Sequence, residues 1–406
     1  MDRLLEALRR NVADVDARGT TKRHEAVVAG VVPASGARGP RYLLDGEGDR
    51  PFLRMNGNGY LGMALRAELR AAEEAAVRAF GAGPGAVRFI SGTYAVHVAL
   101  EERLAAFHDR EAAMLFSSAY GTTLGVLPPL VTPSTAVVSD ALNHNCIINA
   151  TRLAQPAQKL VYAHNDVDEL ARVVAGLAGS CERVLVVTDG VFSMRGDLAP
   201  LAAIASVVRE HDAAFAEGVV LVVDDSHGVG AIGATGRGTE QVTGTAADVL
   251  IATLGKALGV NGGYVTGASD LIAYLRETAP TYIYSNPITA GEAAAALAAI
   301  DLLDSPAGLD LLGHLRAMTE RFEQGLVALG YETIPGEHPV VPLLARDTER
   351  TLALVRHLRA QGILATGLSY PVVPRGEDEI RFQLSADHTA ADVDEALAAL
   401  ASFPGR

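Results

Sequence analysis

Polar residues that follow an apolar run are the first candidates for chemistry. The run VVLVVD ends in Asp224, and Asp225, His227 and two glycines come next. Ligands of α/β proteins bind beyond the carboxyl ends of the strands, so these side chains are predicted to lie where a reaction would take place. A lone aspartate could instead cap the following turn. The combination Asp-Asp-x-His favours a functional site.

A lysine follows a second apolar run, in TLGKALGVNGG, where Lys256 comes three residues after Thr253. An amine with little water around it has a lowered pKa and suits Schiff-base chemistry. A surface position is the ordinary alternative for any lysine. An Asp and a Lys at neighbouring strand ends are, however, the two protein groups that pyridoxal phosphate requires. Asp224 would keep the pyridine nitrogen protonated, and Lys256 would hold the cofactor as an imine and move protons.

The phosphate of such a cofactor needs hydroxyls and backbone N–H groups. The stretch from Ser117 to Gly121 follows a predicted strand and is expected to open a helix. The N-terminus of a helix binds anions, because its first N–H groups have no partner within the helix. We therefore place the phosphate there.

Three other patterns in this region allow different interpretations. Gly228, Gly230 and Gly233 spell GxGxxG after a strand, which is typical of dinucleotide sites, but the residues that follow do not open a helix. The apolar run before Asp224 resembles a Walker B strand. The sequence contains no GxxxxGK[ST] motif, however, which disfavours a P-loop NTPase. A metal site from Asp224, Asp225 and His227 is conceivable, although no helix presents a second pair of ligands.

The elements that must position these residues alternate between strands and helices, which predicts an α/β fold with a largely parallel, seven-stranded sheet. The predicted strands are Ala112–Phe116, Thr135–Ser139, Lys159–Tyr162, Arg183–Thr188, Val219–Asp224, Val249–Thr253 and Gly263–Thr266.

A smaller α+β unit is expected after this sheet. Its predicted elements are Leu309–Leu329, Pro339–Ala345, Thr348–Gln361, Ile363–Thr366, Glu379–Leu384 and Ala390–Ala401. We expect three parts: a helix and extended arm over 1–50, a large domain over 51–300, and a small C-terminal domain over 301–406.

Composition limits the partners and the compartment. The 406 residues are 49% apolar and 20% charged, which is globular, and the net charge of −14 disfavours nucleic-acid and anionic-membrane partners. Two cysteines, Cys146 and Cys181, cannot form a disulfide framework. The charged N-terminal helix does not read as a signal peptide, and no apolar run is long enough to span a bilayer. We expect a cytoplasmic protein.

Several motifs, in this order, resemble one family: NGNGYLGMA, VRFISGT, LNHNCII, TDGVFSMRGD, VDDSHGVGAIGATGRG, TLGKALG, YIYSN and YPVVPRGEDEIRFQLSADHT. The chain resembles the α-oxoamine synthases from about Asn56 to His388. These are fold-type-I, pyridoxal phosphate-dependent transferases. The resemblance implies condensation of a small amino acid with an acyl thioester, carried by CoA or a carrier protein, to an α-amino ketone, with or without decarboxylation. It also implies a homodimer with shared active sites.

Within the family, TDGVFSM and the last motif most resemble 2-amino-3-ketobutyrate CoA ligase, so glycine C-acetyltransferase is the alternative function. Two rivals come from other classes. One is an NAD-dependent dehydrogenase that uses GVGAIG. The other is a binding module that keeps the fold without catalysis, but such a module would be expected to have lost Lys256 or Asp224.

The resemblance implies a role for each matching residue. The catalytic set is Lys256 as the imine-forming base, Asp224 at the pyridine nitrogen, His227 near the phenolic oxygen and His144 on the ring face. Cofactor contacts are also implied for Thr253, Ser118, Ala119, Tyr120 and Ser193. Two further residues, Ser285 and Asn286, would reach the phosphate of the cofactor bound to the other subunit. Substrate binding is implied for Arg381, which would hold the amino-acid carboxylate, with Asn58 and Ser193 close by.

The chain departs from the family pattern around this machinery. Gly59 stands before Tyr-Leu-Gly where the family has Asn or Asp, and Arg195 follows Phe-Ser-Met where it has Asp. Asn145 and Cys146 replace the usual Ala-Ser after Asn-His, and the residues from Ala119 to Thr123 also differ. The chemical groups are kept while their surroundings change, so the acyl donor is not fixed by the sequence.

Overall fold

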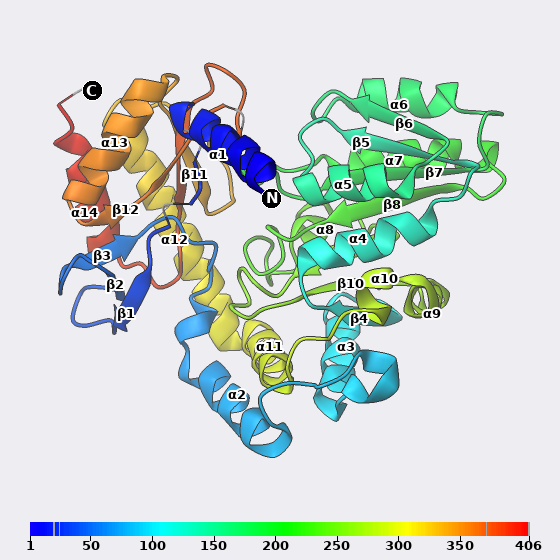
Figure 1. Cartoon of the computed structure of the whole chain (residues 1–406), viewed down its shortest axis with the longest axis horizontal. Helices are drawn as coiled ribbons and strands as arrows, with labels where there is room; N and C mark the ends of the chain where they lie inside the picture. The colour runs from blue at the N-terminus through cyan, green and yellow to red at the C-terminus, as the bar shows by residue number, and fades with distance from the viewer. Residues whose placement is uncertain (19–20, 24, 371, 405–406) are drawn as a thin grey trace.

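The computed structural model describes residues 1–18, 21–23, 25–370 and 372–404. Figure 1 shows a large sheet at the right and a C-terminal unit at the left, with the long helix α12 (Pro306–Ala328) beside the latter. The large sheet has seven strands in the order β4-β10-β9-β8-β7-β5-β6. They are β4 (Ala112–Phe116), β5 (Thr135–Asp140), β6 (Gln158–Tyr162), β7 (Arg183–Asp189), β8 (Val219–Asp224), β9 (Val249–Thr253) and β10 (Gly263–Gly267).

The prediction of a mostly parallel sheet is confirmed. Strands β6, β5, β7, β8 and β9 run parallel, and only β10 is antiparallel to its two neighbours, β4 and β9. Each predicted strand agrees with the structure to within a residue at either end.

Helices cover both faces of this sheet, because successive side chains of a strand point to opposite faces. Val184 and Val186 of β7 pack in a cluster with α6 (Val167–Gly176) and α7 (Leu201–His211). Leu185 and Val187 pack in another cluster with α4 (Ala119–Leu130), α5 (Asn145–Ala154), α9 (Ser269–Thr278) and α10 (Pro280–Ile283). Burial on both faces explains the continuous apolar runs.

The C-terminal unit combines helices and strands, as predicted, and its sheet is antiparallel. Its strands are β11 (Val340–Leu344), β14 (Glu379–Gln383) and β13 (Thr366–Leu368), in that order. The predicted strand Ile363–Thr366 is wrong, because its first two residues form β12 (Ile363–Leu364) of another sheet and its last residue begins β13. The helices are α12, α13 (Thr348–Ala360) and α14 (Ala390–Ala401). Three further helices are α2 (Ala67–Phe80), α3 (Ala95–Phe107) and α11 (Ala290–Leu303), and α11 packs on both of the others. The short helix α8 (Thr239–Thr243) follows the glycine-rich loop after β8.

The N-terminal segment differs from the expected extended arm. After α1 (Asp2–Ala17), which buries none of its side chains, it forms β1 (Val28–Val32) and β2 (Arg41–Leu44). These strands join β3 (Pro51–Arg54) and β12 (Ile363–Leu364) in a four-stranded sheet. Glycine and proline around short strands hid this sheet from the sequence pattern. The division at residues 50 and 300 stays a prediction.

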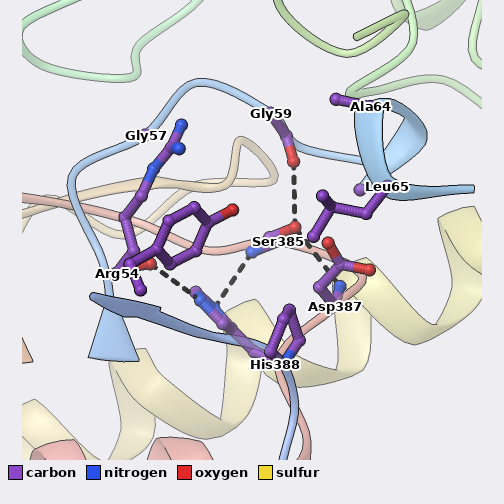
Figure 2. A pocket seen from close by; sticks show the side chains of 11 residues that line it. Arg54, Gly57, Gly59, Ala64, Leu65, Ser385, Asp387 and His388 are labelled. Atoms are coloured by element: carbon purple, nitrogen blue, oxygen red, sulfur yellow. Dashed lines mark hydrogen bonds between the residues drawn. The ribbon is translucent and has the colours of Figure 1, made fainter. Parts of the chain in front are cut away.

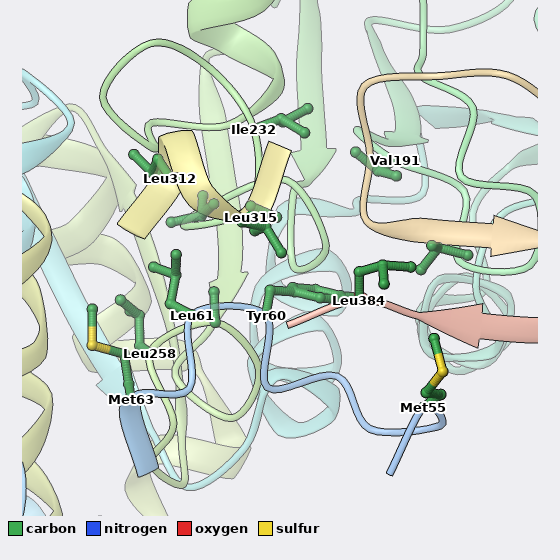
Figure 3. Close-up of a cluster of buried hydrophobic side chains, with 14 of the residues drawn as sticks. Met55, Tyr60, Leu61, Met63, Val191, Ile232, Leu258, Leu312, Leu315 and Leu384 are labelled. Atoms are coloured by element: carbon green, nitrogen blue, oxygen red, sulfur yellow. The ribbon is translucent and has the colours of Figure 1, made fainter. Parts of the chain in front are cut away.

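One hydrophobic core joins the two units, as Figure 3 shows. Met55, Tyr60 and Leu61 lie on the loop after β3 and pack in the same cluster as Leu315 of α12. Leu384, directly after β14, and Leu258, two residues after Lys256, belong to it as well. The loop over residues 55–62 is therefore held between the elements that carry the candidate site residues. None of the helices among the described residues is both long enough and apolar enough to cross a membrane.

Candidate active site

A pocket of about 350 Å³ lies at the carboxyl ends of β7 and β8. Its lining includes seven residues predicted from the sequence: Ala119, Tyr120, His144, Ser193, Asp224, His227 and Lys256. Three further lining residues were not predicted: Cys146, Asp189 and Ser226. The residues that the motifs placed together are thus brought together by the fold.

Lys256 is half-buried and lines the pocket, whereas the other two lysines, Lys22 and Lys159, are exposed. Burial lowers the pKa of the Lys256 amine, and the carboxylates of Asp224 and Asp189 oppose that shift. A lowered pKa increases the neutral, nucleophilic fraction of the amine. This agrees with the chemistry predicted for Lys256.

Asp189 and Asp224 end adjacent parallel strands and lie directly opposite each other in the register of β7 and β8. Burial raises the pKa of Asp189 well above its ordinary value, and the nearby Asp224 raises it further. Two buried carboxylates side by side need positive charge or hydrogen-bond donors around them. The pocket is therefore built for a cationic group in addition to Lys256.

The two neighbouring aspartates after β8 have different partners. Asp224 faces the pocket: its Oδ1 accepts from the Ser226 N–H (3.1 Å), and its Oδ2 lies 3.6 Å from the Cys146 Sγ. Asp225 points away and accepts from the backbone N–H (2.7 Å) and hydroxyl (2.6 Å) of Thr239. A Cβ on Gly228 would meet the Asp225 carboxylate at 2.1 Å. Asp225 therefore orders the loop after β8.

This packing answers the alternative interpretations of the loop. The first glycine of GxGxxG, Gly228, makes room for Asp225, and the motif precedes no helix before the five-residue α8. Among the described residues, no group of three or more His, Cys, Asp and Glu side chains is arranged to hold a metal ion. The loop has neither the helix of a dinucleotide site nor a set of metal ligands.

His144 caps the N-terminus of α5 and faces the pocket. Its backbone N–H donates to Asp189 Oδ2 (2.8 Å), and its Nδ1 accepts from the Cys146 N–H (3.2 Å). The Cys146 Sγ also lies 2.9 Å from Nδ1. Burial lowers the pKa of His144 and raises that of Cys146, so the ring is neutral and the sulfur is a thiol. The proton of the His144 ring then lies on Nε2, because Nδ1 is the acceptor.

His227 meets residues from distant parts of the chain. Its Nδ1 lies 2.7 Å from the hydroxyl of Tyr60, which in turn lies 3.3 Å from Asn58 Oδ1. The same Asn58 oxygen accepts from Arg381 Nη2 (3.2 Å). Burial lowers the pKa of His227 well below its ordinary value. The predicted substrate-binding residues Arg381 and Asn58 are thus connected to the pocket through Tyr60.

The predicted phosphate end is the start of α4. Ser118 caps this helix and accepts from the Gly121 N–H (3.0 Å), while Thr253 accepts from the Gly255 N–H (3.0 Å). A Cβ on Gly263 would lie 2.4 Å from the Ala119 nitrogen, so only glycine lets β10 approach the helix start this closely. Ala119 and Tyr120, the first residues of α4, line the pocket, and the first N–H groups of a helix have no partner within it.

Ser285 and Asn286 are not brought to this pocket. They lie between α10 and α11, and neither belongs to its lining. Asn286 is exposed, and the preceding Tyr284 is 82% exposed. Their assignment to the site of another subunit stays a prediction.

The donor set fits pyridoxal phosphate. A buried lysine amine, a pair of carboxylates short of positive charge and a helix N-terminus meet in one pocket. The hydroxyl oxygen of Ser226 is buried there and has no hydrogen-bond partner within the described residues. Such an orphaned hydroxyl has room for a ligand.

A larger pocket of about 520 Å³ lies behind the loop that carries Asn58 and Tyr60 (Figure 2). The Ser385 hydroxyl donates to the Gly59 carbonyl (2.9 Å), and the His388 Nε2 lies 3.0 Å from the Arg54 carbonyl. None of the predicted site residues lines this pocket. Its hydrogen bonds fix the loop from behind.

A family model described as aminotransferase class I and II matches residues 50–400. The chain is 40% identical to 8-amino-7-oxononanoate synthase of Geobacter metallireducens over 371 residues, which cover 91% of this chain and 92% of that protein. A solved structure of serine palmitoyltransferase from Sphingomonas wittichii matches with a TM-score of 0.86 at 27% identity, over 98% of this chain and 96% of that one. An SPT structure with PLP as an internal aldimine has a TM-score of 0.87 at 24% identity, with the same coverage, and supports the fold.

The loop that carries Ser193 is held by a charged network that predicts a pH dependence of stability. His164 Nδ1 lies 3.1 Å from Asp140, and its Nε2 lies 3.0 Å from Asp197, which follows Ser193 on the loop. Burial alone would lower the pKa of His164, but the bonds to both carboxylates raise it to about 9. Because the folded-state pKa exceeds the ordinary value of about 6.5, this stabilisation is complete below that pH and is lost as the pH rises through 9.

We expect the stability difference between wild type and His164→Asn to shrink between pH 6 and pH 9.5, by at most about 3 kcal/mol. Urea unfolding at both pH values measures this difference. His357→Asn is the control, because His357 bonds the Ala399 carbonyl and the Ser402 hydroxyl instead of carboxylates. An equal difference at both pH values would contradict the charged state of His164.

Proposed function

The chain belongs to the aminotransferase class I and II family, and from this premise we propose that it is a pyridoxal phosphate-dependent α-oxoamine synthase. It condenses a small amino acid with an acyl thioester. The observation that carries this proposal is the convergence of Lys256, Asp224, His144 and His227 on one pocket, in a chain that matches the family over residues 50–400.

Pyridoxal phosphate, when bound, supplies a carbonyl for the amine of the substrate and a protonated ring that takes up electrons from its α-carbon. Lys256 holds the cofactor and removes and returns the proton at the substrate α-carbon. The Asp224 carboxylate keeps the ring nitrogen protonated. His144 offers its ring face, and His227 a hydrogen bond to the phenolic oxygen.

The remaining cofactor contacts are assigned to the phosphate. The first N–H groups of α4, at Ala119 and Tyr120, are directed at an anion, and the hydroxyls of Ser118 and Thr253 lie at the same end. Support comes from the close approach of β10 to the start of α4, which glycine at position 263 allows.

Arg381 is assigned to the carboxylate of the amino acid, with Asn58 and Ser193 close to it. Arg381 is largely buried, and its Nε has no hydrogen-bond partner within the described residues. A buried guanidinium with a free N–H is suited to a bidentate bond with a carboxylate.

In the reaction, the α-carbon of the amino acid forms a bond to the acyl carbon of the thioester. The carbon–sulfur bond breaks, and the thiol leaves. The product either keeps the carboxylate or loses it as CO2, with a proton added in its place. Lys256 lies in the position to handle both proton transfers.

Two pairs of substrates should be assayed first. The relatives with about 40% identity are 8-amino-7-oxononanoate synthases, which favours alanine with a seven-carbon dicarboxylic acyl thioester. The motif resemblance to 2-amino-3-ketobutyrate CoA ligase favours glycine with an acetyl thioester. The comparisons do not test that branch assignment. They do set aside a dehydrogenase, because the chain belongs to another family.

We also place the active sites at a homodimer interface and the protein in the cytoplasm. The dimer is supported by the exposure of Asn286 outside the pocket of its own chain. The compartment is supported by the two free cysteines.

The function is tested by incubating the cofactor-loaded protein with pairs of amino acids and acyl thioesters, and by measuring thiol release together with product mass. We expect release that depends on both substrates. Lys256→Ala should abolish it, because general base catalysis alone contributes about 10²- to 10⁴-fold. Borohydride reduction should attach the cofactor to Lys256 and leave the exposed Lys159 unmodified. Turnover within tenfold of wild type in Lys256→Ala would refute the mechanism.

Arg381→Ala should weaken amino-acid binding, read from the spectrum of the cofactor, by about 30-fold to several-thousand-fold, because removal of one partner of a buried charge pair is costly. Acyl-thioester binding should change much less, and Arg381→Lys should recover part of the loss. Arg356→Ala, on the exposed face of α13, is the control. Unchanged amino-acid affinity in Arg381→Ala would leave the carboxylate without its assigned partner.

The shared site is tested by mixing two inactive chains. Lys256→Ala contributes an intact Asn286, and Asn286→Ala contributes an intact Lys256. If the sites are shared, each heterodimer has one complete site, and random exchange should restore about a quarter of wild-type activity. Absence of rescue, after subunit exchange has been verified by mass, would mean that each site is built within one chain.

A further inference from the structure

A buried series of hydrogen bonds runs from Arg381 to His227 through the hydroxyl of Tyr60. Tyr60 is fully buried, and its oxygen lies 2.7 Å from His227 Nδ1. The guanidinium of Arg381 donates to Asn58 Oδ1 at 3.2 Å, and it lies close enough to the Tyr60 hydroxyl to affect the pKa of that hydroxyl. One hydroxyl therefore lies between the assigned carboxylate-binding group and the histidine assigned to the cofactor.

The direction of these bonds follows from counting protons. Burial raises the pKa of Tyr60, so its hydroxyl keeps one proton. A separation of 2.7 Å is typical of an O–H donor, whereas the 3.3 Å to Asn58 Oδ1 is long for one. Tyr60 therefore gives its proton to His227 Nδ1, because Arg381 has only donors and cannot accept it.

The tautomer of His227 follows from this direction. Burial lowers its pKa, so the ring is neutral and carries a single proton. Since Nδ1 accepts from Tyr60, that proton is on Nε2. His227 lines the pocket, and a donor at Nε2 is what an anionic phenolic oxygen requires there.

Both partners are held in place by their surroundings. His338 Nε2 donates to the backbone carbonyl of His227 (2.9 Å), and its ring packs edge-on against Tyr60 with a centroid separation of 5.2 Å. The Ala386 N–H donates to the Tyr60 carbonyl (2.7 Å), and Ser385 holds Gly59 from behind (Figure 2). These contacts hold the Tyr60 ring and backbone in place, so the hydroxyl oxygen stays beside His227 Nδ1.

We propose that Tyr60 is a positioning residue: its hydroxyl keeps His227 in the tautomer with the proton on Nε2, and it ties that tautomer to Arg381. The proposal rests on the proposed function for the roles of His227 and Arg381. Tyr60 itself touches neither substrate nor cofactor in this assignment. It acts through the histidine.

The chain offers a matched control. Tyr264 is also fully buried, and its hydroxyl lies 2.8 Å from Nε2 of the buried His108. Neither residue lines the pocket. Tyr264→Phe therefore removes an equivalent tyrosine–histidine bond elsewhere in the molecule.

The tautomer is measured by ¹⁵N NMR of cofactor-free protein labelled at histidine, with the His227 signals identified by their loss in His227→Asn. Wild type should show the proton on Nε2. Tyr60→Phe should shift both His227 nitrogens toward a mixture of tautomers, and Tyr264→Phe should leave them unchanged. A wild-type proton on Nδ1, or an unchanged His227 in Tyr60→Phe, would overturn the proposal. If the Tyr60→Phe variant does not fold, the wild-type spectrum alone still shows which nitrogen of His227 carries the proton.

The kinetic test follows exchange of the substrate α-proton in cofactor-loaded enzyme. Tyr60→Phe leaves a buried ring nitrogen without its donor, so kcat should fall roughly ten- to hundredfold, while KM for the amino acid changes less. Tyr264→Phe should change neither. A rise in KM for the amino acid with an unchanged kcat would contradict the link between Tyr60 and His227. The NMR result needs no substrate, so a protein with the Nε2 tautomer but no condensation activity would refute the proposed function alone.

Discussion

The pairing of β7 with β8 places two carboxylates, Asp189 and Asp224, next to each other below the surface. Buried like charges are costly, and removing one member of a balanced group is costlier still, so the surroundings must supply compensating donors and cations. The backbone N–H of His144 meets Asp189, that of Ser226 meets Asp224, and Lys256 stands near both. The rest of the pocket can be understood from this requirement. In the proposed function, a protonated pyridine ring would supply further positive charge beside these carboxylates.

The two structural units contribute different parts of the site. The large sheet supplies the lysine and the aspartates at the ends of its parallel strands, where such groups converge. The C-terminal unit supplies Arg381 from β14, and the loop over residues 55–62 connects the two with Asn58 and Tyr60. Because the loop is packed within the continuous core that both units share (Figure 3), the distance between Arg381 and the pocket is set by core packing.

The sequence predicted those parts of the molecule whose signals are local. The parallel strands are continuous β-branched runs, and the strand-end rule placed Asp224 and Lys256 in the pocket. In the structure, Ile380 and Phe382 lie in the core and the residue between them, Arg381, is half-buried on the other face of β14. Asp189 was missed although TDG ends a strand in the same way. Tyr60 was missed because its partner is 167 residues away in the chain, a separation that no periodicity reveals. The strands β1 and β2 were missed because they are short and flanked by glycine and proline, and β1 is also largely exposed.

The departures from the family pattern occupy two kinds of position. Cys146 lies inside the site, where its thiol and N–H both contact His144 Nδ1 and so help to fix the tautomer of that ring. Arg195 lies at the rim, where it pairs with Asp197 (3.2 Å) and with Glu377 of the C-terminal unit (3.6 Å). In the proposed function, Cys146 would hold the proton of the His144 ring on Nε2. Arg195 joins the Ser193 loop to the unit that carries Arg381.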